Sequence, residues 1–302
     1  MANRKTADYQ EYMAADLAKY KGELFPLKSG FLRRVFVRKV RWNKLHPNPD
    51  DEFCKPQVGP SHRIITEYEQ KFRKMEQEYG NYYAREDPIV VVRVYPEGYM
   101  ILNGHHRWAA AVQMGFEKIR VSIINVMLET DIKQTIGHSA NHKRVTLDLD
   151  EVVLCTQEGV TAEKELPFPF NRLYPMRLRS GIPALFHYLE NNGYDIWVYS
   201  AQFYSIEYIK AFFHKYHVHV SGIVTGTEKR TKIMTDVKKK LDELVEEQYH
   251  FTLHIDNKMV LQSFSQTHRF EEHGLKGSAS WAEEVKQIIE EIDRKGEIDQ
   301  NG

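Results

Sequence analysis

Hydrophobic and polar positions follow different patterns in the two halves of the chain. In the first half, strand-like runs rich in β-branched residues alternate with segments of helical periodicity. The pattern predicts helices at 7–20, 61–80 and 105–115, strands at 33–45 and 117–126, and a β-hairpin at 87–104. We therefore expect a small α+β domain at residues 33–128, preceded by an N-terminal helical extension at residues 1–32.

Short apolar runs that end in polar residues characterise the second half of the chain. These runs predict strands at 144–155, 193–201, 221–226 and 250–257, with helical segments between them at 180–191, 204–215 and 229–248. Strands that alternate with helices favour a parallel α/β sheet. We expect this second domain at residues 144–302, and the polar segment 129–143 is the predicted linker.

The composition is that of a globular protein with balanced charge. The 302 residues include 42 lysines and arginines and 42 aspartates and glutamates, so the formal net charge is zero. A protein that coats nucleic acid by charge alone is usually basic. Nucleic acid is therefore a candidate partner that the net charge does not support, although a local basic patch would be compatible with it.

The cysteines and the N-terminal sequence indicate a cytoplasmic protein. Cys54 and Cys155 form neither a disulfide framework nor a zinc-ligand pattern, as expected in a reducing compartment. The N-terminus lacks the apolar core of a signal peptide, and no run approaches the ~18 apolar residues of a membrane-spanning helix. We expect no membrane partner.

Two aspartates at the end of a predicted strand give the strongest chemical signal. In the sequence VTLDLDEVV, Asp148 and Asp150 follow an apolar run, and two close carboxylates repel each other unless a cation or a proton intervenes. Mg²⁺ prefers such oxygen ligands, but a solvated acidic turn explains the pair equally well. Further polar residues end the other predicted strands or open the helix after the third strand: Ser200, Lys229, Lys232 and Asp256. The carboxyl ends of parallel strands meet at one edge of a sheet, so we expect these residues to converge.

The ordered motifs resemble those of the haloacid dehalogenase (HAD) superfamily over roughly residues 143–290. DLDEVV is similar to the DLDET-type first motif of the RNA polymerase C-terminal-domain phosphatases in that superfamily. The resemblance implies a Rossmann-like domain in which Asp148 is the nucleophile that forms an aspartyl-phosphate. It implies that Asp150 acts first as general acid and then as base.

The same resemblance implies the remaining parts of a phosphatase site. Ser200 would bind the phosphoryl oxygens, and either Lys229 or Lys232 would neutralise phosphoryl charge. Mg²⁺ would be held by the carboxylates of Asp148 and Asp256 and the main-chain carbonyl of Asp150. Asn257 departs from the family pattern, because many members have a second acid there.

The spacing of these motifs predicts a domain without a large cap. The intervals from Asp148 to Ser200 and from Ser200 to Lys229 are too short to hold a separate lid domain. Residues 157–181 could form a flap at most. An open site suits a large substrate, such as a phosphoprotein or a nucleic-acid end.

In the first half, the sequence GHHRWAAA places three basic or titratable side chains at the start of a predicted helix. A helix N-terminus attracts anions, so Gly104, His105, His106 and Arg107 are candidate phosphate-binding residues. In the alternative interpretation, His105 caps the turn and Arg107 pairs with an acid such as Glu86 or Asp87.

The strand and turn at these residues resemble the ParB/sulfiredoxin family over roughly residues 33–127. Gly104, His106, Arg107 and Ala110 match the family signature G-x-H-R-x-x-A, and His105 fills its variable position. The resemblance implies that a nucleoside triphosphate binds at the turn. Cys54, in the loop at 53–65, is interpreted as a structural thiol rather than a redox centre.

The sequence as a whole predicts an Mg²⁺-dependent phosphohydrolase with a ParB-like nucleotide-binding domain. Its substrate would be a phosphorylated macromolecule or a nucleotide. A first alternative is a nucleic-acid-associated ParB-like nucleotide-binding protein in which the HAD-like half is a non-catalytic scaffold. A second alternative is a ParB-like small-molecule kinase centred on Arg107.

Overall fold

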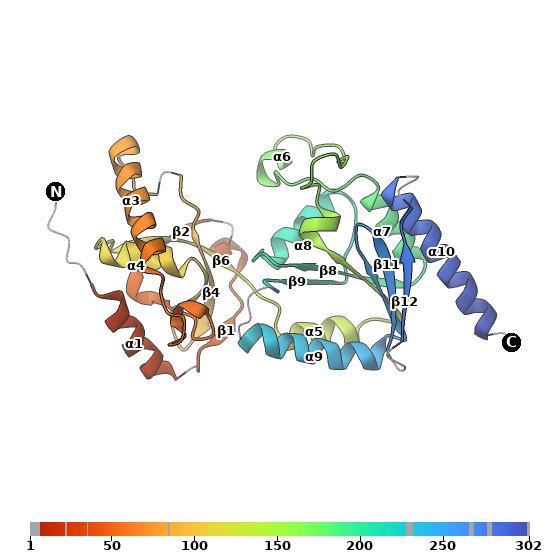
Figure 1. Cartoon of the computed structure of the whole chain (residues 1–302), viewed down its shortest axis with the longest axis horizontal. Helices are drawn as coiled ribbons and strands as arrows, with labels where there is room; N and C mark the ends of the chain where they lie inside the picture. Colours follow the sequence, from red (N-terminus) through yellow and green to blue (C-terminus); the bar gives the residue numbers. More distant parts are fainter. Residues whose placement is uncertain are drawn as a thin grey trace. The chain divides into compact units, whose positions relative to one another are not determined.

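The chain folds into two compact units, each built around its own β-sheet (Figure 1). The computed structural model describes residues 7–21, 23–34, 36–83, 85–227, 232–265, 269–276 and 280–300. The first unit comprises Met1–Val126 together with Lys229–Ile233, and the second comprises Met127–Glu228 and Met234–Gly302. Among the residues that the structure describes, every helix is too short or too polar to span a lipid bilayer.

The first unit packs its long helices against a mixed sheet. Its helices are α1 (Tyr9–Tyr20), α2 (Phe31–Arg34), α3 (His62–Tyr79) and α4 (His105–Gln113), with short 3₁₀ turns at Trp42–Lys44 and Glu52–Cys54. Its strands are β1 (Phe25–Leu27), β2 (Arg38–Arg41), β3 (Leu45–His46), β4 (Ile89–Tyr95), β5 (Tyr99–Asn103) and β6 (Lys118–Ile124). The sheet order is β2-β6-β4-β5-β3, and β1 pairs with β4.

The predicted hairpin and the helix that follows it form the centre of this unit. β4 and β5 are antiparallel neighbours, and α4 begins directly after β5. Trp108 and Ala109 of α4 are fully buried in a cluster with Phe72 of α3 and Val91 of β4. Burial of this apolar face is what fixes the start of α4 against the sheet.

The predicted strand at 33–45 is wrong over its first part. α2 occupies residues 31–34, and strand structure is limited to β2 and, after the 3₁₀ turn at Trp42–Lys44, the first residue of β3. Arginine side chains explain the difference, because they satisfy backbone carbonyls beside the short helix: Arg34 donates to the carbonyl of Ser29 at 2.8 Å, and Arg38 donates to that of Leu32 at 2.8 Å.

The second unit is a three-layer α/β structure with a mostly parallel sheet. Its helices are α5 (Glu129–Gly137), α6 (Phe170–Leu173), α7 (Ile182–Asn191), α8 (Ile206–Lys215), α9 (Lys232–Gln248) and α10 (Trp281–Gln300). Its strands are β7 (Lys143–Asp148), β8 (Tyr194–Ser200), β9 (Gly222–Thr225), β10 (Phe251–Ile255), β11 (Met259–Phe264) and β12 (Phe270–Gly274). The order is β12-β11-β10-β7-β8-β9, in which β10, β7, β8 and β9 are parallel.

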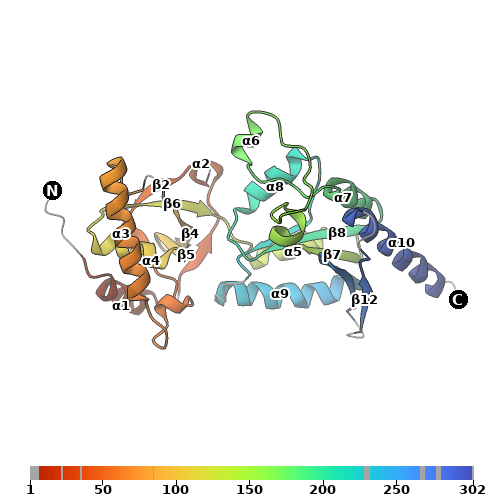
Figure 2. The same ribbon diagram turned by 45° about the horizontal axis from the view of Figure 1, so that its top comes forward.

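Helices cover both faces of this sheet, as Figures 1 and 2 show. On one face, Val145 and Leu147 of β7 belong to a large apolar cluster with residues of α7, α8 and α10. On the other face, Trp197 of β8 packs with Ile132 of α5 and Leu241 of α9. Since successive strand residues point to opposite faces, the even-numbered residues of β7 face α5 and α9.

Two predicted boundaries in this unit are corrected by the structure. The segment 129–143 is not a free linker, because α5 forms there and buries Ile132 and Ile136 in the second unit. The strand expected at 144–155 ends at Asp148, where a π-helical turn at Leu149–Val153 begins. The side chain of Asp148 accepts the N–H of Glu151 and so caps that turn at 2.7 Å.

The expectation of a small flap agrees with the described chain between β7 and α7. This segment holds α6 and two isolated antiparallel bridges, Leu154↔Leu178 and Ala162↔Arg179, with no separate lid domain among the residues that the structure describes there. The antiparallel strands β11 and β12 and the helix α10 lie beyond the last predicted strand, in a stretch for which the sequence pattern predicted no element.

Candidate functional site

Polar side chains meet at the carboxyl ends of the parallel strands in the second unit. Asp148 ends β7, Asp150 lies in the turn after it, and Ser200 ends the neighbouring strand β8. The register pairs Asp148 with Tyr199, so the parallel pairing itself brings the two strand ends together. The predicted convergence of Asp148, Asp150 and Ser200 therefore follows from topology.

The carboxylate of Asp150 is held by two hydroxyl groups. Ser200, which is fully buried, donates to Oδ2 at 2.6 Å, and Tyr204 donates to Oδ1 at 2.9 Å. Burial, together with the hydrogen bond to Asp150, raises the pKa of Tyr204 above its usual value, so this phenol stays a donor. The sequence did not single out Tyr204, because it lies in the loop before α8 and belongs to no strand end.

Negative charge gathers around Asp148. Burial raises the pKa of its carboxyl, and the charges of Asp150 and Asp256 raise it further, whereas backbone hydrogen bonds from Glu151 and Asp150 oppose the shift. Mutual repulsion of this kind is what a divalent cation relieves. The three aspartates therefore share one electrostatic environment.

Asp256 lies in the turn that joins β10 to β11. Its N–H donates to the carbonyl of Met259 at 2.9 Å. The next residue, Asn257, accepts from Arg179 at 2.6 Å and donates to the carbonyl of Glu151 at 3.2 Å. Asn257 thus ties this turn to the turn after β7 and to the flap, a structural role that fits its departure from the expected acid.

Arg179 is a cation at this edge that the sequence did not identify. Its guanidinium lies 4.2 Å from the ring centre of Trp281, and the indole of Trp281 donates to the carbonyl of Asp256 at 3.3 Å. Burial lowers the pKa of Arg179 from its usual value. Its position depends on the path of the flap, for which the local sequence gives no signal.

The donor set fits the expected magnesium site in kind. The carboxylates of Asp148 and Asp256 and the carbonyl of Asp150 are hard oxygen ligands, and that carbonyl already accepts from Thr156 at 2.7 Å. Within the described ranges, no group of three or more His, Cys, Asp and Glu side chains is placed to hold a metal ion. The expected set contains only two such side chains, so Mg²⁺ binding stays a prediction.

The two candidate lysines cannot be placed at the site. Lys229 lies outside the described residues, and for Lys232 only its position as the first residue of α9 is described. The expectation that one of them neutralises phosphoryl charge therefore stays a prediction.

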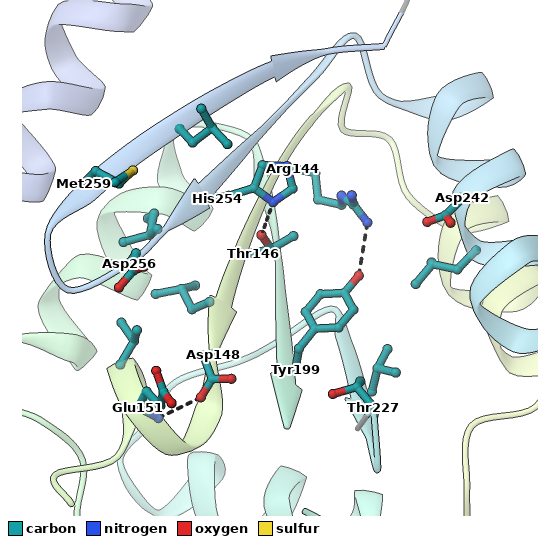
Figure 3. A pocket seen from close by; sticks show the side chains of 16 residues that line it. Arg144, Thr146, Asp148, Glu151, Tyr199, Thr227, Asp242, His254, Asp256 and Met259 are labelled. Carbon is teal, nitrogen blue, oxygen red and sulfur yellow. Dashed lines mark hydrogen bonds between the residues drawn. The ribbon is translucent and has the colours of Figure 1, made fainter. Parts of the chain in front are cut away.

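A cavity of about 570 Å³ extends from this edge along the α5/α9 face of the sheet (Figure 3). Asp148, Glu151 and Asp256 line one part of it, and Thr227 and Tyr199 line another. The cavity also reaches residues deeper along the strands: Arg144, Thr146 and His254. Its size is that of a site for a small organic ligand.

In the first unit, Gly104 forms the turn between β5 and α4. Its φ of 103° lies in the left-handed region, and a Cβ there would lie 3.1 Å from Nη2 of Arg107. Glycine therefore lets the Arg107 side chain fold back against the turn. No side-chain hydrogen bond caps this end of α4.

The two histidines of the turn bind the loop that precedes α3. His105, which is buried, accepts the N–H of Asn48 at its Nε2 (3.1 Å), and His106 accepts the N–H of Ser61 at its Nε2 (3.1 Å). Nδ1 of His105 also lies 3.5 Å from the carboxylate of Asp51. These nitrogens position the loop.

Arg107 forms the structural ion pair that the alternative interpretation of the turn expected. Its Nη1 donates to the carbonyl of Asp87 at 2.6 Å and lies 3.4 Å from the buried carboxylate of Glu86. Lys71 contacts the other oxygen of Glu86 at 2.6 Å. Nε of Arg107 is buried and has no hydrogen-bond partner among the described residues. The ion pair with Glu86 does not by itself exclude an anionic ligand at the turn.

Comparison with known proteins identifies the region around this turn. Residues 84–140 match the family profile described as the ParB N-terminal domain. The crystal structure of the C-terminally truncated chromosome-partitioning protein ParB from Caulobacter crescentus, complexed with CTP-gamma-S, matches with 21% sequence identity and a TM-score of 0.23. That match covers 35% of this chain and 56% of the ParB chain, so it spans little more than half of the latter. No curated protein matches the chain.

Proposed function

We propose, from the ParB N-terminal domain at residues 84–140, that the first unit binds the phosphates of a nucleotide at the start of α4. The observation that carries the proposal is the turn itself. It lies within the matched residues, and Gly104 leaves room for the Arg107 guanidinium to fold against it. Nε of that guanidinium is buried and has no hydrogen-bond partner in the described ranges. In the protein as a whole, the nucleotide would control association with nucleic acid.

The physical basis is the electrostatics of a helix end. The first N–H groups of a helix carry partial positive charge and favour an anion there. The carboxylate of Glu86 lies 3.4 Å from Nη1 of Arg107, and a bound phosphate would take over part of that guanidinium. Binding then exchanges one anionic partner of Arg107 for another, while its bond to the carbonyl of Asp87 can remain.

Calorimetric titration of CTP, ATP and GTP tests this proposal. We expect Arg107→Ala to weaken binding by about 1.5–3 kcal/mol, the scale of a charge-assisted hydrogen bond. Glu86→Gln is the matched control, because it breaks the same ion pair but keeps the arginine, and we expect it to retain nucleotide affinity. If wild type binds no nucleotide, or if Arg107→Ala binds as wild type does, the proposal fails.

The role of nucleic acid is tested separately from nucleotide binding. DNA affinity would be measured at several salt concentrations, with and without the bound nucleotide, since phosphate contacts make binding salt-dependent. A change in DNA affinity on nucleotide addition supports the control function. Consumption of ATP that requires an alcohol or amino-acid acceptor would instead support a small-molecule kinase.

The second unit supports a further candidate function, an HAD-like phosphohydrolase. The specific observation is the pair of hydroxyls, from Ser200 and Tyr204, that fixes the carboxylate of Asp150 beside Asp148. The strand order β10-β7-β8-β9 supports it, since it brings Asp148, Ser200 and Asp256 to one edge. The absence of a lid domain between β7 and α7, within the described chain, leaves that edge open to a macromolecular phosphate.

In this mechanism the carboxylate of Asp148 attacks phosphorus and the bond from phosphorus to the leaving oxygen breaks. Asp150 enters this step protonated, with the Ser200 hydroxyl turned to accept rather than donate, and gives its proton to the departing oxygen. Asp150 then takes a proton from the water that attacks the aspartyl-phosphate, which releases inorganic phosphate and restores Asp148. Mg²⁺, held by Asp148, Asp256 and the carbonyl of Asp150, would reduce the repulsion between the carboxylate and the phosphate.

Hydrolysis of an aryl phosphate with and without Mg²⁺ tests this candidate. A panel of phosphopeptides and of oligonucleotides phosphorylated at either end would follow. Turnover that requires both Mg²⁺ and Asp148 supports the phosphohydrolase. A well-folded wild-type protein that hydrolyses none of these substrates supports the scaffold alternative.

A further inference from the structure

One face of the parallel sheet carries polar residues where apolar residues are usual. Strands buried on both faces normally read as almost continuous apolar runs. On the face that α5 and α9 cover, β7 instead presents Arg144 and Thr146, and β10 presents Thr252 and His254, which lie opposite them in the register. The cavity of about 570 Å³ lies on this face.

Arg144 is a buried cation that has no carboxylate partner within the part of the chain that the structure describes. Its side chain is 7% exposed, and its Nε and Nη1 donate to two neutral hydroxyls, those of Thr252 at 3.1 Å and Tyr199 at 3.3 Å. Figure 3 shows the guanidinium directed toward Tyr199. A buried charge is costly unless it is paired or well hydrogen-bonded.

Nearby groups do not replace the missing counter-ion. Asp195 lies opposite Arg144 in the register, but its carboxylate accepts from Asn141 at 2.9 Å and from Tyr249 at 2.5 Å, and it forms no ion pair with Arg144. Asp242 lines the cavity as well. Burial raises the pKa of Tyr199, and the charge of Asp242 adds to that shift, whereas the charge of Arg144 opposes it.

Arg144 lines the cavity. Its Nε and Nη1 make the two hydrogen bonds to hydroxyls, and its guanidinium lies 5.7 Å from the ring centre of Tyr249. Both ring nitrogens of His254 are occupied, since its Nδ1 contacts Thr146 at 2.8 Å and its Nε2 contacts Ser263 at 3.0 Å.

We propose that this cavity binds a small organic anion, whose carboxylate or phosphate group pairs with Arg144. The body of the ligand would contact the aromatic ring of Tyr199 and the apolar side chains of Val224, Leu241 and Leu261, which line the same cavity. This site is separate from the turn at Gly104. It shares its cavity with Asp148 and Asp256, but anion binding at Arg144 needs no chemistry at Asp148.

Calorimetry with three ligands of one shape tests the proposal: phenylphosphonate, benzoate and the uncharged benzamide. Phenylphosphonate cannot be hydrolysed as a phosphate ester, so turnover at Asp148 cannot consume it. We expect at least one of the two anions to bind ten times or more tightly than benzamide. Comparison of the two anions then distinguishes a phosphate ligand from a carboxylate ligand.

Variants locate the bound anion. We expect Arg144→Gln to weaken binding of the preferred anion tenfold or more, and Leu261→Trp to do the same by filling the cavity from a half-buried position. Arg294→Gln is the matched control, since Arg294 is exposed on α10 and its loss should leave affinity unchanged. If Arg144→Gln does not fold, Leu261→Trp decides.

Three results would overturn the proposal. The first is that neither anion binds wild type, and the second is that benzamide binds as tightly as the anions. The third is that a folded Arg144→Gln or Leu261→Trp variant binds the anion as wild type does. Thermal unfolding of each variant establishes that it is folded.

Discussion

The Ser200 hydroxyl donates a 2.6 Å hydrogen bond to the Asp150 carboxylate, joining residues 50 positions apart in the sequence. The parallel pairing of β7 with β8 makes this contact, because it places the turn after one strand beside the last residue of the other. Tyr204 holds the second carboxylate oxygen. The carboxylate is thus oriented from two sides before any substrate binds.

Removal of either hydroxyl should release the Asp150 carboxylate. We expect Ser200→Ala and Tyr204→Phe each to lower the free energy of unfolding by roughly 1–3 kcal/mol, the range for hydrogen bonds to charged groups and for partners left unpaired. Urea unfolding of the two single variants and the double variant measures this. If the two hydroxyls share the Asp150 carboxylate, the loss of stability in the double variant should differ from the sum of the two single losses. A double variant whose loss equals that sum would contradict this coupling.

Substitution of the proposed nucleophile should separate fold from chemistry. Asp148→Asn keeps a side-chain oxygen that can accept the N–H of Glu151, but an amide does not form an acyl-phosphate. We expect loss of aryl phosphate hydrolysis without loss of the cooperative thermal transition. Unchanged turnover would remove the phosphohydrolase candidate.

A Gly104→Ala substitution should lower stability by more than the strain of a left-handed backbone conformation, because the new Cβ also crowds its neighbours. The new Cβ would lie 3.1 Å from Nη2 of Arg107 and 3.2 Å from Cγ1 of Ile89. Gly80→Ala is the control, because Gly80 also has a positive φ, of 64°, but its Cβ would meet nothing within 4 Å. We expect the control to lose about 1–2 kcal/mol of stability from the left-handed backbone, and Gly104→Ala to lose more.

Nucleotide affinity gives the second measurement on the same pair of variants. Only Gly104→Ala should weaken binding of the preferred nucleotide, because only its Cβ displaces Arg107. Equal losses of stability and affinity in both variants would show that crowding at Arg107 plays no part.

Cys54 should react slowly with alkylating reagents in the folded protein. Burial, followed by the charges of Asp51 and Asp16, raises the pKa of its thiol to about 12, so little thiolate exists at pH 8. Because the folded pKa lies above the unfolded value, this group contributes stability below about pH 9 that is lost as the pH rises toward 12. Mass spectrometry of native protein treated with iodoacetamide tests it, with unfolded protein as the control. Rapid native labelling at pH 8 would contradict it and would reopen the redox interpretation of Cys54.

The sequence predicted the parts of the fold that depend on local pattern and on the rules of parallel sheets. Helices α3 and α7 and strands β4 and β8 agree with the hydrophobic periodicity. Asp148, Asp150 and Ser200 converge because parallel strands end at the same edge. Neither result requires knowledge of loop paths.

Contacts that depend on loop paths could not be predicted. Arg179 reaches Asn257 from the flap, and Asn48 and Ser61 supply the N–H groups that His105 and His106 accept. No periodicity links such pairs across the sequence, since tertiary packing selects them. The prediction of a linker at 129–143 was wrong because this segment is mostly polar. Only Ile132 and Ile136, one helical turn apart, mark the buried face of α5.

The position of α5 limits how the two halves of this chain could be exchanged. The ParB profile match extends to residue 140, whereas the N-terminal segment of the first unit ends at Val126, so α5 falls inside the matched sequence but packs in the second unit. A chimera that replaced the chain through residue 140 with another ParB N-terminal domain would bring a foreign helix against Trp197. A junction at residue 127 would keep the native α5 on its sheet. The first unit can therefore be exchanged without disturbing the second only if the junction precedes α5.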